Sequence, residues 1–211
     1  MTRLDELSII DFAHELGSDS PAPGGGSTAA LAGALSCSLI SMVAKITLKR
    51  EGDPEKNIKL KELITQAETS GREFTKLIND DTNAFNDILK CFKLPKETDN
   101  EKQARMDAIQ AATKHAAEVP LKTARLGLRI LTYVKTLSEI GSENAITDTG
   151  VAGLMANSAI KGAIWNVKIN LSSMKDSGFV QETNFELEKL LESTRTLWSE
   201  IQKNVEDKVI K

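Results

Sequence analysis

The residue with the clearest chemical potential is an aspartate inside an apolar stripe. Between Pro54 and Phe92 the residues that recur every third or fourth position are apolar or small, and the exception is Asp81. Burial raises the pKa of a carboxyl group in a helix-bundle interior unless the group is paired. A carboxyl with a raised pKa can accept and return a proton near neutral pH. The pattern therefore makes Asp81 a candidate general acid–base. The stripe consists of Leu60, Ile64, Ala67, Gly71, Phe74, Ile78, Asp81, Phe85, Ile88 and Phe92.

A structural interpretation of Asp81 is also open. The carboxylate could be satisfied by a helix terminus or by an arginine, with Arg125 and Arg129 as candidates. Neighbouring Asp80 points away from the stripe and is expected to be solvated. Because an acid on this stripe is unusual, we favour a functional role for Asp81 over a purely structural one.

A second candidate site is the glycine loop that precedes a hydrophobic segment. Its residues Pro23, Gly24, Gly25, Gly26 and Ser27 lead directly into a predicted helix. Three glycines let the backbone approach a ligand closely, and the N–H groups of a helix start suit a carboxylate, phosphate or carbonyl oxygen. No Lys-Ser or Lys-Thr follows, so this is not a nucleotide-binding P-loop. Tight packing at a crowded helix junction explains the loop equally well.

Polar residues also lie at both ends of a helix face made of small side chains. Asp148, Asn166 and Asn170 fall on one face of a predicted helix, together with Ala152, Met155, Ala159 and Gly162. The two asparagines lie one turn apart and can together hold an amide-like ligand edge. Asp148 is about 27 Å from Asn166 along a straight helix, so one chain cannot place both in one site. An antiparallel dimer could bring them together, while a plain packing seam is an equal alternative for the asparagines.

The elements that position these residues all read as helices. We expect helices over 4–16, 27–50, 54–92, from about 99 to a kink or stop near Pro120, 121–140, 141–175 and 182–211. Asp53 before Pro54 is a good helix start, and Thr98 with Glu101 has capping-box spacing. The sequence therefore predicts one all-α domain over residues 1–211. Its expected architecture is a bundle of about six long antiparallel helices.

Composition narrows the function classes. The net charge is −3 and aromatic residues make up 4%, which argues against a nucleic-acid partner. Cys37 and Cys91 form no CxxC pair, and His14 and His115 lack ligand-like neighbours, so no metal site is expected. The uncharged stretch from Ser27 to Ala44 is rich in hydroxyls and is expected to be buried in the bundle rather than in a membrane. The acidic N-terminus is unlike a signal peptide, and a cytoplasmic location is expected.

Seven short motifs together resemble one family, the formiminotetrahydrofolate cyclodeaminases and methenyltetrahydrofolate cyclohydrolases. They occur in the family's order and spacing over essentially the whole chain. One departure is Asn79, where the family often has an acid two residues before its motif aspartate. The motifs are Ser20-Pro-Ala-Pro-Gly-Gly-Gly-Ser27, Ser41-Met-Val-Ala44, Asp81-Thr-Asn-Ala-Phe85, Leu94-Pro-Lys96, Val119-Pro-Leu121, Thr147-Asp148 and Asn166-Val-Lys-Ile-Asn-Leu171.

The resemblance implies a helical homodimer that acts on a tetrahydrofolate derivative without any further cofactor. It implies that Asp81 is the proton acceptor, that Asp148 is a second polar or acidic group, and that the glycine loop and Asn166 to Leu171 bind substrate. Since no formiminotransferase segment is attached, methenyltetrahydrofolate cyclohydrolase is the first hypothesis and formiminotetrahydrofolate cyclodeaminase the second. A dimer that binds folate or a partner helix without turnover is the alternative from another class.

Overall fold

The computed structural model describes residues 3–209, and all regular structure in that range is helical. This confirms the predicted all-α class and the number of helices. Two short 3₁₀ turns, η1 (Leu4–Glu6) and η2 (Glu143–Ala145), precede α1 and α5. The six α-helices are α1 (Ile9–Leu16), α2 (Gly25–Leu48), α3 (Pro54–Phe92), α4 (Asp99–Ile140), α5 (Ile146–Leu171) and α6 (Ser177–Val209).

Local capping explains where α3 and α4 begin. The Asp53 side chain accepts hydrogen bonds from the N–H groups of Glu55 and Lys56, and Pro54 occupies the first turn. Thr98 and Glu101 form the predicted capping box, in which each side chain accepts from the other residue's N–H. Both predicted helix starts are therefore confirmed, as are the bounds of α3.

Several other predicted boundaries differ from the structure, including those of α2, expected over 27–50, and the end of α5, expected at 175 and found at Leu171. The first helix was expected from Leu4, but Ser8 caps α1, which begins at Ile9 after the η1 turn. The helix expected from Gly141 begins at Ile146, after η2. The last helix begins at Ser177, five residues before the expected start at Glu182. Helix propensity alone does not predict such boundaries, because tertiary contacts decide whether a terminal turn is α-helical, 3₁₀ or irregular.

Of the two outcomes predicted near Pro120, a kink or a stop, the stop is wrong: α4 continues through Pro120 as one helix. Proline has no N–H group, so the carbonyl oxygen of Ala116, four residues earlier, lacks its usual donor. The Asn170 side chain of α5 donates a hydrogen bond to this oxygen at 2.9 Å. A side chain from a neighbouring helix thus supplies the bond that the proline removes.

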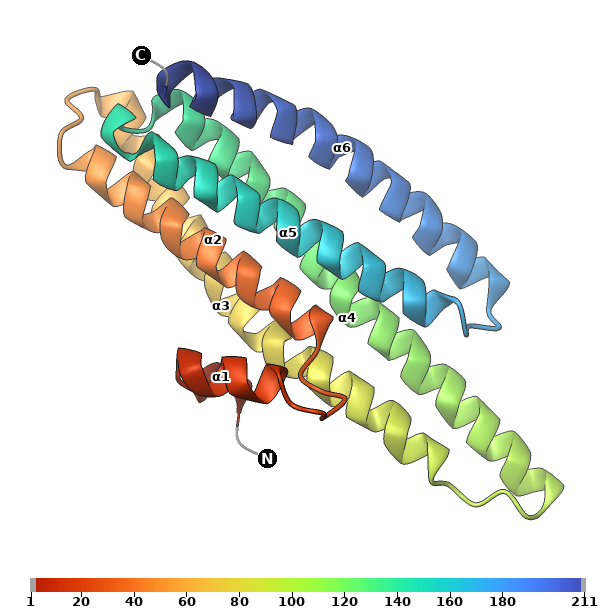
Figure 1. Cartoon of the computed structure of the whole chain (residues 1–211). Coiled ribbons are helices and arrows are strands. Elements are labelled where there is room, and N and C mark those ends of the chain that lie inside the picture. The colour runs from red at the N-terminus through yellow and green to blue at the C-terminus, as the bar shows by residue number, and fades with distance from the viewer. Residues whose placement is uncertain (1–2, 210–211) are drawn as a thin grey trace.

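The helices α2, α3, α4 and α5 form the core bundle, and α6 lies along α4 and α5 (Figure 1). Two close approaches show how tightly the helices pack. Gly33 of α2 leaves space for the Phe74 ring of α3, and Gly127 of α4 leaves space for Ile160 of α5. Each of these glycine positions faces a buried side chain where a Cβ atom would collide. Consecutive helices run antiparallel, as predicted.

The C-terminal end of α3 and the N-terminal end of α4 project together beyond the rest of the bundle (Figure 1). Because α2 begins alongside Asp81, no α2 turn covers the last eleven residues of α3. The apolar stripe changes there from core to partly open surface: Phe74 and Ile78 are buried, Phe85 and Ile88 half-buried, and Phe92 is 52% exposed. Asp81 lies at the transition.

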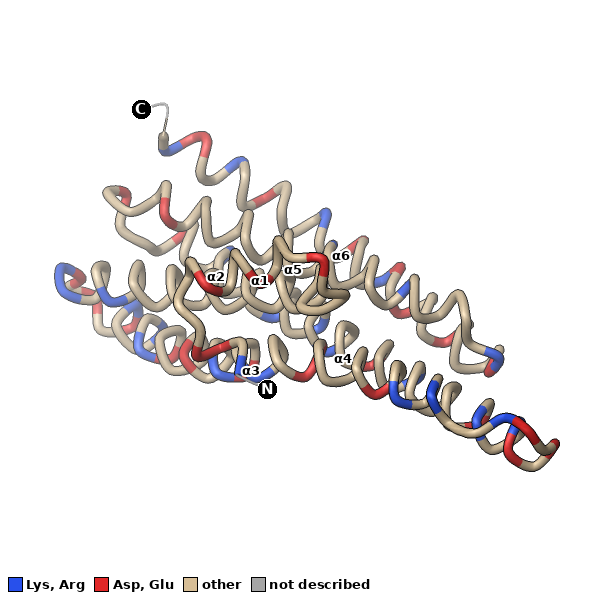
Figure 2. The backbone as a smooth tube through the Cα atoms, turned by 60° about the horizontal axis from the view of Figure 1, so that its bottom comes forward, with Lys and Arg blue, Asp and Glu red and all other residues tan. Residues whose placement is uncertain are grey.

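Helix α2 carries no acidic or basic residue from Gly25 to Ala44, and the tube view shows few charges on α2 and α5 compared with α3, α4 and α6 (Figure 2). By length and hydropathy (mean 1.7) α2 is the one helix among residues 3–209 that could span a membrane, and half of that window is buried in the bundle. Its buried polar groups are satisfied inside the fold, since the Ser36 hydroxyl donates to the carbonyl oxygen of Ala152 in α5.

Candidate active site

The Asp81 carboxyl lies against the first turn of α2. The Ser27 hydroxyl is 3.1 Å from Oδ2 of Asp81, 2.9 Å from the carbonyl oxygen of Ile78 and 3.1 Å from the Thr82 hydroxyl. Residues more than 50 positions apart in the sequence therefore meet at this point. The positive end of the α2 dipole also faces the carboxyl group.

Burial raises the pKa of Asp81 above its ordinary value, and hydrogen bonds from the side chain and backbone of Ser27 oppose this rise. No arginine contributes: Arg125 pairs with Glu186 and Arg129 pairs with Glu73. Of the two partners considered for the carboxylate, a helix terminus and an arginine, the structure has the helix terminus. Burial outweighs the Ser27 hydrogen bonds, so the pKa of the carboxyl is raised overall.

Gly26 fits against Asp81 only because it has no side chain. A Cβ atom there would overlap both carboxyl oxygens and the Cγ atom of Asp81. A Cβ atom added to Gly24 would have no other atom within 4 Å. One added to Gly25 would make an ordinary 3.4 Å contact with Nδ2 of Asn166. The glycine loop thus serves close packing at Gly26 above all.

The C-terminal part of α5 completes this junction. Asn166 lies beside Gly25, and its side chain donates to the carbonyl oxygen of Gly162 at 2.8 Å. The Asn170 side-chain nitrogen donates to Ala116, as described above, and to the carbonyl oxygen of Asn166 at 2.9 Å. Asp81, Gly24 to Ser27 and Asn166 therefore gather at one end of the bundle, while the Asn170 nitrogen is engaged by the backbone.

Asp148 lies at the opposite end of α5, in its first turn. It is eighteen residues from Asn166, or about 27 Å at 1.5 Å per residue. Since α2 and α5 run antiparallel, this end of α5 is beside the C-terminal end of α2, where the Ser142 N–H donates to the Thr47 hydroxyl. One chain therefore does not bring Asp148 to Asp81.

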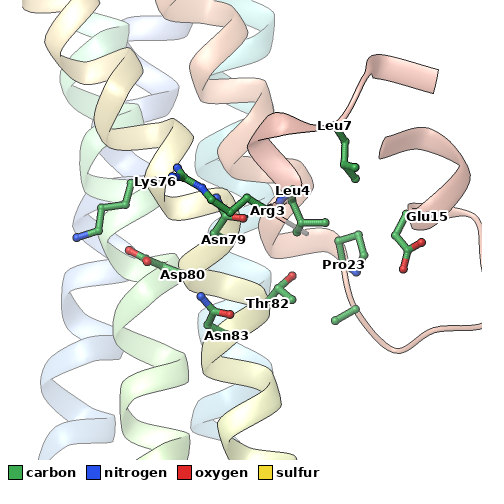
Figure 3. Close-up of a pocket in the computed structure, with 11 residues that line it drawn as sticks. Arg3, Leu4, Leu7, Glu15, Pro23, Lys76, Asn79, Asp80, Thr82 and Asn83 are labelled. Carbon is green, nitrogen blue, oxygen red and sulfur yellow. Dashed lines mark hydrogen bonds between the residues drawn. The ribbon is translucent and has the colours of Figure 1, made fainter. Parts of the chain in front are cut away.

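A cavity of about 520 Å³ lies between α3 and the N-terminal segment (Figure 3), and Asp81 is not among the residues that line it. Thr82, whose hydroxyl contacts Ser27, lines it, and Asp81 lies behind this wall. Of the residues predicted to bind substrate, Pro23 is in the lining. The lining is Arg3, Leu4, Leu7, Glu15, Ala22, Pro23, Lys76, Asn79, Asp80, Thr82 and Asn83.

Sequence reasoning missed the N-terminal contribution to this cavity. Arg3, Leu4 and Leu7 line it, and Asn79 of α3 binds the same segment. The partners are separated by more than 70 residues, so no local spacing reveals them. The one available signal was the unusual asparagine two residues before Asp81. Among residues 3–209 no three His, Cys, Asp or Glu side chains gather as metal ligands would.

Comparisons with known proteins identify the family of the chain. Residues 8–189 match the family described as formiminotransferase-cyclodeaminase. The chain is 37% identical to a methenyltetrahydrofolate cyclohydrolase from Methylorubrum extorquens over 202 residues, which is 96% of this chain and 97% of the relative. It is 33% identical to the mouse formimidoyltransferase-cyclodeaminase, covering 90% of this chain but 35% of that longer protein.

The fold is also that of a solved relative. The crystal structure of a formiminotetrahydrofolate cyclodeaminase from Thermotoga maritima superposes with a TM-score of 0.88, at 26% identity, over 98% of this chain and 99% of that one. The extent of the match, the shared fold and the position of Asp81 lead to one conclusion: this chain belongs to the formiminotransferase-cyclodeaminase family.

Proposed function

We propose that this protein is a methenyltetrahydrofolate cyclohydrolase that interconverts 5,10-methenyltetrahydrofolate and 10-formyltetrahydrofolate. The similarity that supports this choice over cyclodeamination spans nearly the full length of both chains, whereas the chain spans about a third of the mouse cyclodeaminase. The observation that carries a catalytic role is the Asp81 carboxyl, held against the first turn of α2 with a raised pKa. The proposal involves no cofactor besides the folate substrate.

In the proposed reaction Asp81 transfers one proton twice. Water attacks the methenyl carbon between the two folate nitrogens while the ionised carboxyl group takes a proton from it. The protonated carboxyl then returns the proton to the ring nitrogen N5 as the bond from N5 to the former methenyl carbon breaks. The remaining hydroxyl proton leaves to solvent, so the cationic methenyl group becomes a neutral formyl group on N10 and one proton is released overall. Acid–base catalysis of this kind contributes on the order of 10²–10⁴-fold in rate. A raised pKa supports both halves, because it makes the carboxylate a stronger base for the first transfer and keeps more of the conjugate acid present for the second.

The second candidate is formiminotetrahydrofolate cyclodeaminase. Its chemistry uses the same carboxyl: the N10 amine attacks the formimino carbon, ammonia leaves, and 5,10-methenyltetrahydrofolate forms. The superposition with the Thermotoga maritima cyclodeaminase favours this candidate, at 26% identity. In both reactions the glycine loop and Asn166 would contact the substrate beside Asp81.

The proposal includes a homodimer that pairs the α2–α5 face of two subunits. This face exposes six large apolar side chains: Leu35, Met42, Val151, Leu154, Trp165 and Ile169. Asp148 and Asn166 are five helical turns apart on one side of α5, so an antiparallel pairing places Asp148 of the partner subunit near Asn166. A dimer would thereby add the second acidic group that one chain cannot supply. We also propose a cytoplasmic location, which suits the two unpaired cysteines.

One pair of assays tests the proposed function. The purified protein is mixed with 5,10-methenyltetrahydrofolate and, separately, with 5-formiminotetrahydrofolate, and the methenyl absorbance is followed. Enzyme-dependent loss in the first assay supports the cyclohydrolase, and gain in the second supports the cyclodeaminase. No change in either assay, with a protein that is dimeric and folded, would refute both and leave a non-catalytic folate-binding dimer.

A further inference from the structure

The N-terminal residues Arg3–Leu7, which we call the strap, are fixed to α3 by a single asparagine. The Asn79 side-chain oxygen accepts the backbone N–H of Leu4 at 2.8 Å, and its nitrogen donates to Oδ1 of Asp5 at 2.6 Å. Both ends of one amide are thus used by two adjacent residues of the strap. This arrangement requires a group that accepts and donates, which an amide provides and a carboxylate does not.

Asp5 is the buried member of this arrangement. Its side chain is 7% exposed, and the Arg3 guanidinium binds it through two nitrogens, at 3.1 and 2.6 Å. The Arg3 guanidinium, together with Asn79, holds the pKa of the Asp5 carboxyl below its usual range, although burial opposes this. Asp5 is therefore a fixed negative charge that faces the amide nitrogen of Asn79.

The strap forms one wall of the cavity that Thr82 also lines, and the Thr82 hydroxyl contacts the same Ser27 hydroxyl that contacts the Asp81 carboxyl. Leu4 lies between Asn79 of α3 and Pro23 of the glycine loop, and Leu7 lies farther along the same wall (Figure 3). The apolar part of the lining comes from Leu4, Leu7, Ala22 and Pro23. A flat aromatic ring system is the part of a folate that fits such a wall.

We propose that Asn79 is a positioning residue for substrate binding: by fixing the strap to α3 it holds Leu4 and Leu7 where they contact the ring portion of a folate next to Asp81. This inference rests on the proposed function, since it takes the ligand to be a folate. It adds that the site requires residues 3–7, and that Asn79 and Asp5 act as a matched pair.

The pair can be tested by exchanging its two side chains. N79D places two carboxylates in contact and removes the donor, so the strap should detach from α3. We expect KM for the folate substrate to rise about tenfold, the factor that about 1.4 kcal/mol of lost binding corresponds to, while kcat changes much less. D5N/N79D restores a donor opposite an acceptor at unchanged net charge, and should return KM to within about threefold of the parent.

The pH dependence separates positioning from general damage to the fold. The charged groups around the pair are Arg3 and Glu6 of the strap, Lys76 and Asp80 of α3, and Glu15 of α1. In N79D one of the two touching carboxylates takes up a proton as the pH falls, and the shared proton re-forms the hydrogen bond. The ratio of KM in N79D to KM in the parent should therefore decrease toward acidic pH, and D5N/N79D should show no such trend.

The outcomes are distinguishable. If the parent protein turns over neither folate, the proposed function fails. The role of the strap is then still tested by calorimetry, which measures the binding of tetrahydrofolate to the parent, N79D and D5N/N79D. If the parent is active and N79D has an unchanged KM at every pH, the inference is wrong. If N79D raises KM but D5N/N79D does not restore it, Asn79 does not act through Asp5 and the matched pair is refuted.

Discussion

At the scale of single residues, the cost of holding Asp81 in the fold determines how the protein responds to pH. The pKa of this carboxyl is higher in the folded than in the unfolded chain, so its ionised form is less stable when folded. This penalty is absent below the unfolded pKa, grows as the pH rises through the folded pKa, and is complete above it. Above the folded-state pKa, the protein is therefore less stable than it would be if the pKa of this carboxyl were unshifted.

Replacing this carboxyl should separate stability from turnover. Asp81→Asn is expected to lower kcat by about 10²–10⁴-fold because the amide accepts no proton. It should raise the melting temperature at pH 7.5, with a difference that shrinks as the pH falls and the parent carboxyl becomes protonated as well. Asp87→Asn, which removes an exposed carboxyl paired with Lys90 on the same helix, is the matched control. Full activity in Asp81→Asn would contradict the assignment.

The glycine beside the carboxyl gives a steric test. Gly26→Ala forces the added methyl group into the space of the Asp81 carboxyl, so the carboxyl must move, and kcat is expected to fall by at least about tenfold. Gly24→Ala adds the same methyl group two residues away, where nothing lies within 4 Å, and should lower kcat far less. Equal kcat values in the two variants, determined with the methenyl assay, would show that the contact is unimportant.

The sequence identified Asp81 because its neighbours on α3 set a regular pattern that it breaks. The same reasoning could not find the Asn79–Asp5 pair: Asn79 stands out against the family motif, but no local spacing links it to Asp5, 74 positions earlier. It also assigned Asn170 to ligand binding on spacing alone, before the carbonyl oxygen that its nitrogen binds was known. Residues that act within one helix are visible in a pattern, and residues that act across helices need the fold.

At the scale of elements, α4 shows how one helix corrects a defect in another. The proline penalty that predicted a kink or stop at Pro120 is real, yet it is offset by Asn170, fifty positions later in the chain. By contrast, Asp53 with Pro54 and Thr98 with Glu101 carry their capping partners within a few residues. Helix starts of that local kind were predicted correctly for this reason.

The bond between α4 and α5 can be measured by a double-mutant cycle. Asn170→Ala leaves the Ala116 oxygen without a donor and should lower the free energy of unfolding by about 1–3 kcal/mol. In a Pro120→Ala background the new N–H group can bind Ala116, so the same change at position 170 should cost clearly less. Urea denaturation of the four proteins checks this. Equal costs in the two backgrounds would mean that Asn170 stabilises the protein through other contacts.

At the scale of the whole molecule, the exposed α2–α5 face is the surface on which the proposed dimer depends. Leu35→Glu puts a charge at a position that is 49% exposed and central to that face, so it should yield monomers and lower activity by at least about tenfold. Ile58→Glu changes an even more exposed apolar residue, on α3, and should alter neither property. Sedimentation measures the oligomeric state and the methenyl assay measures the activity. A fully active monomeric Leu35→Glu protein would contradict a site shared between subunits.

The central position of α2 also has a consequence for how the chain is made. Helix α2 leaves the ribosome early, but the α5 backbone that its Ser36 hydroxyl binds lies 116 residues later. At about 5–20 residues per second, synthesis of the chain between Ser36 and Ala152 takes on the order of 5–20 s, and α2 lacks its contact with α5 during that time. Throughout that interval only α3 and α4 can shield it, so the nascent chain depends on the local hairpins to stay soluble until α5 is complete.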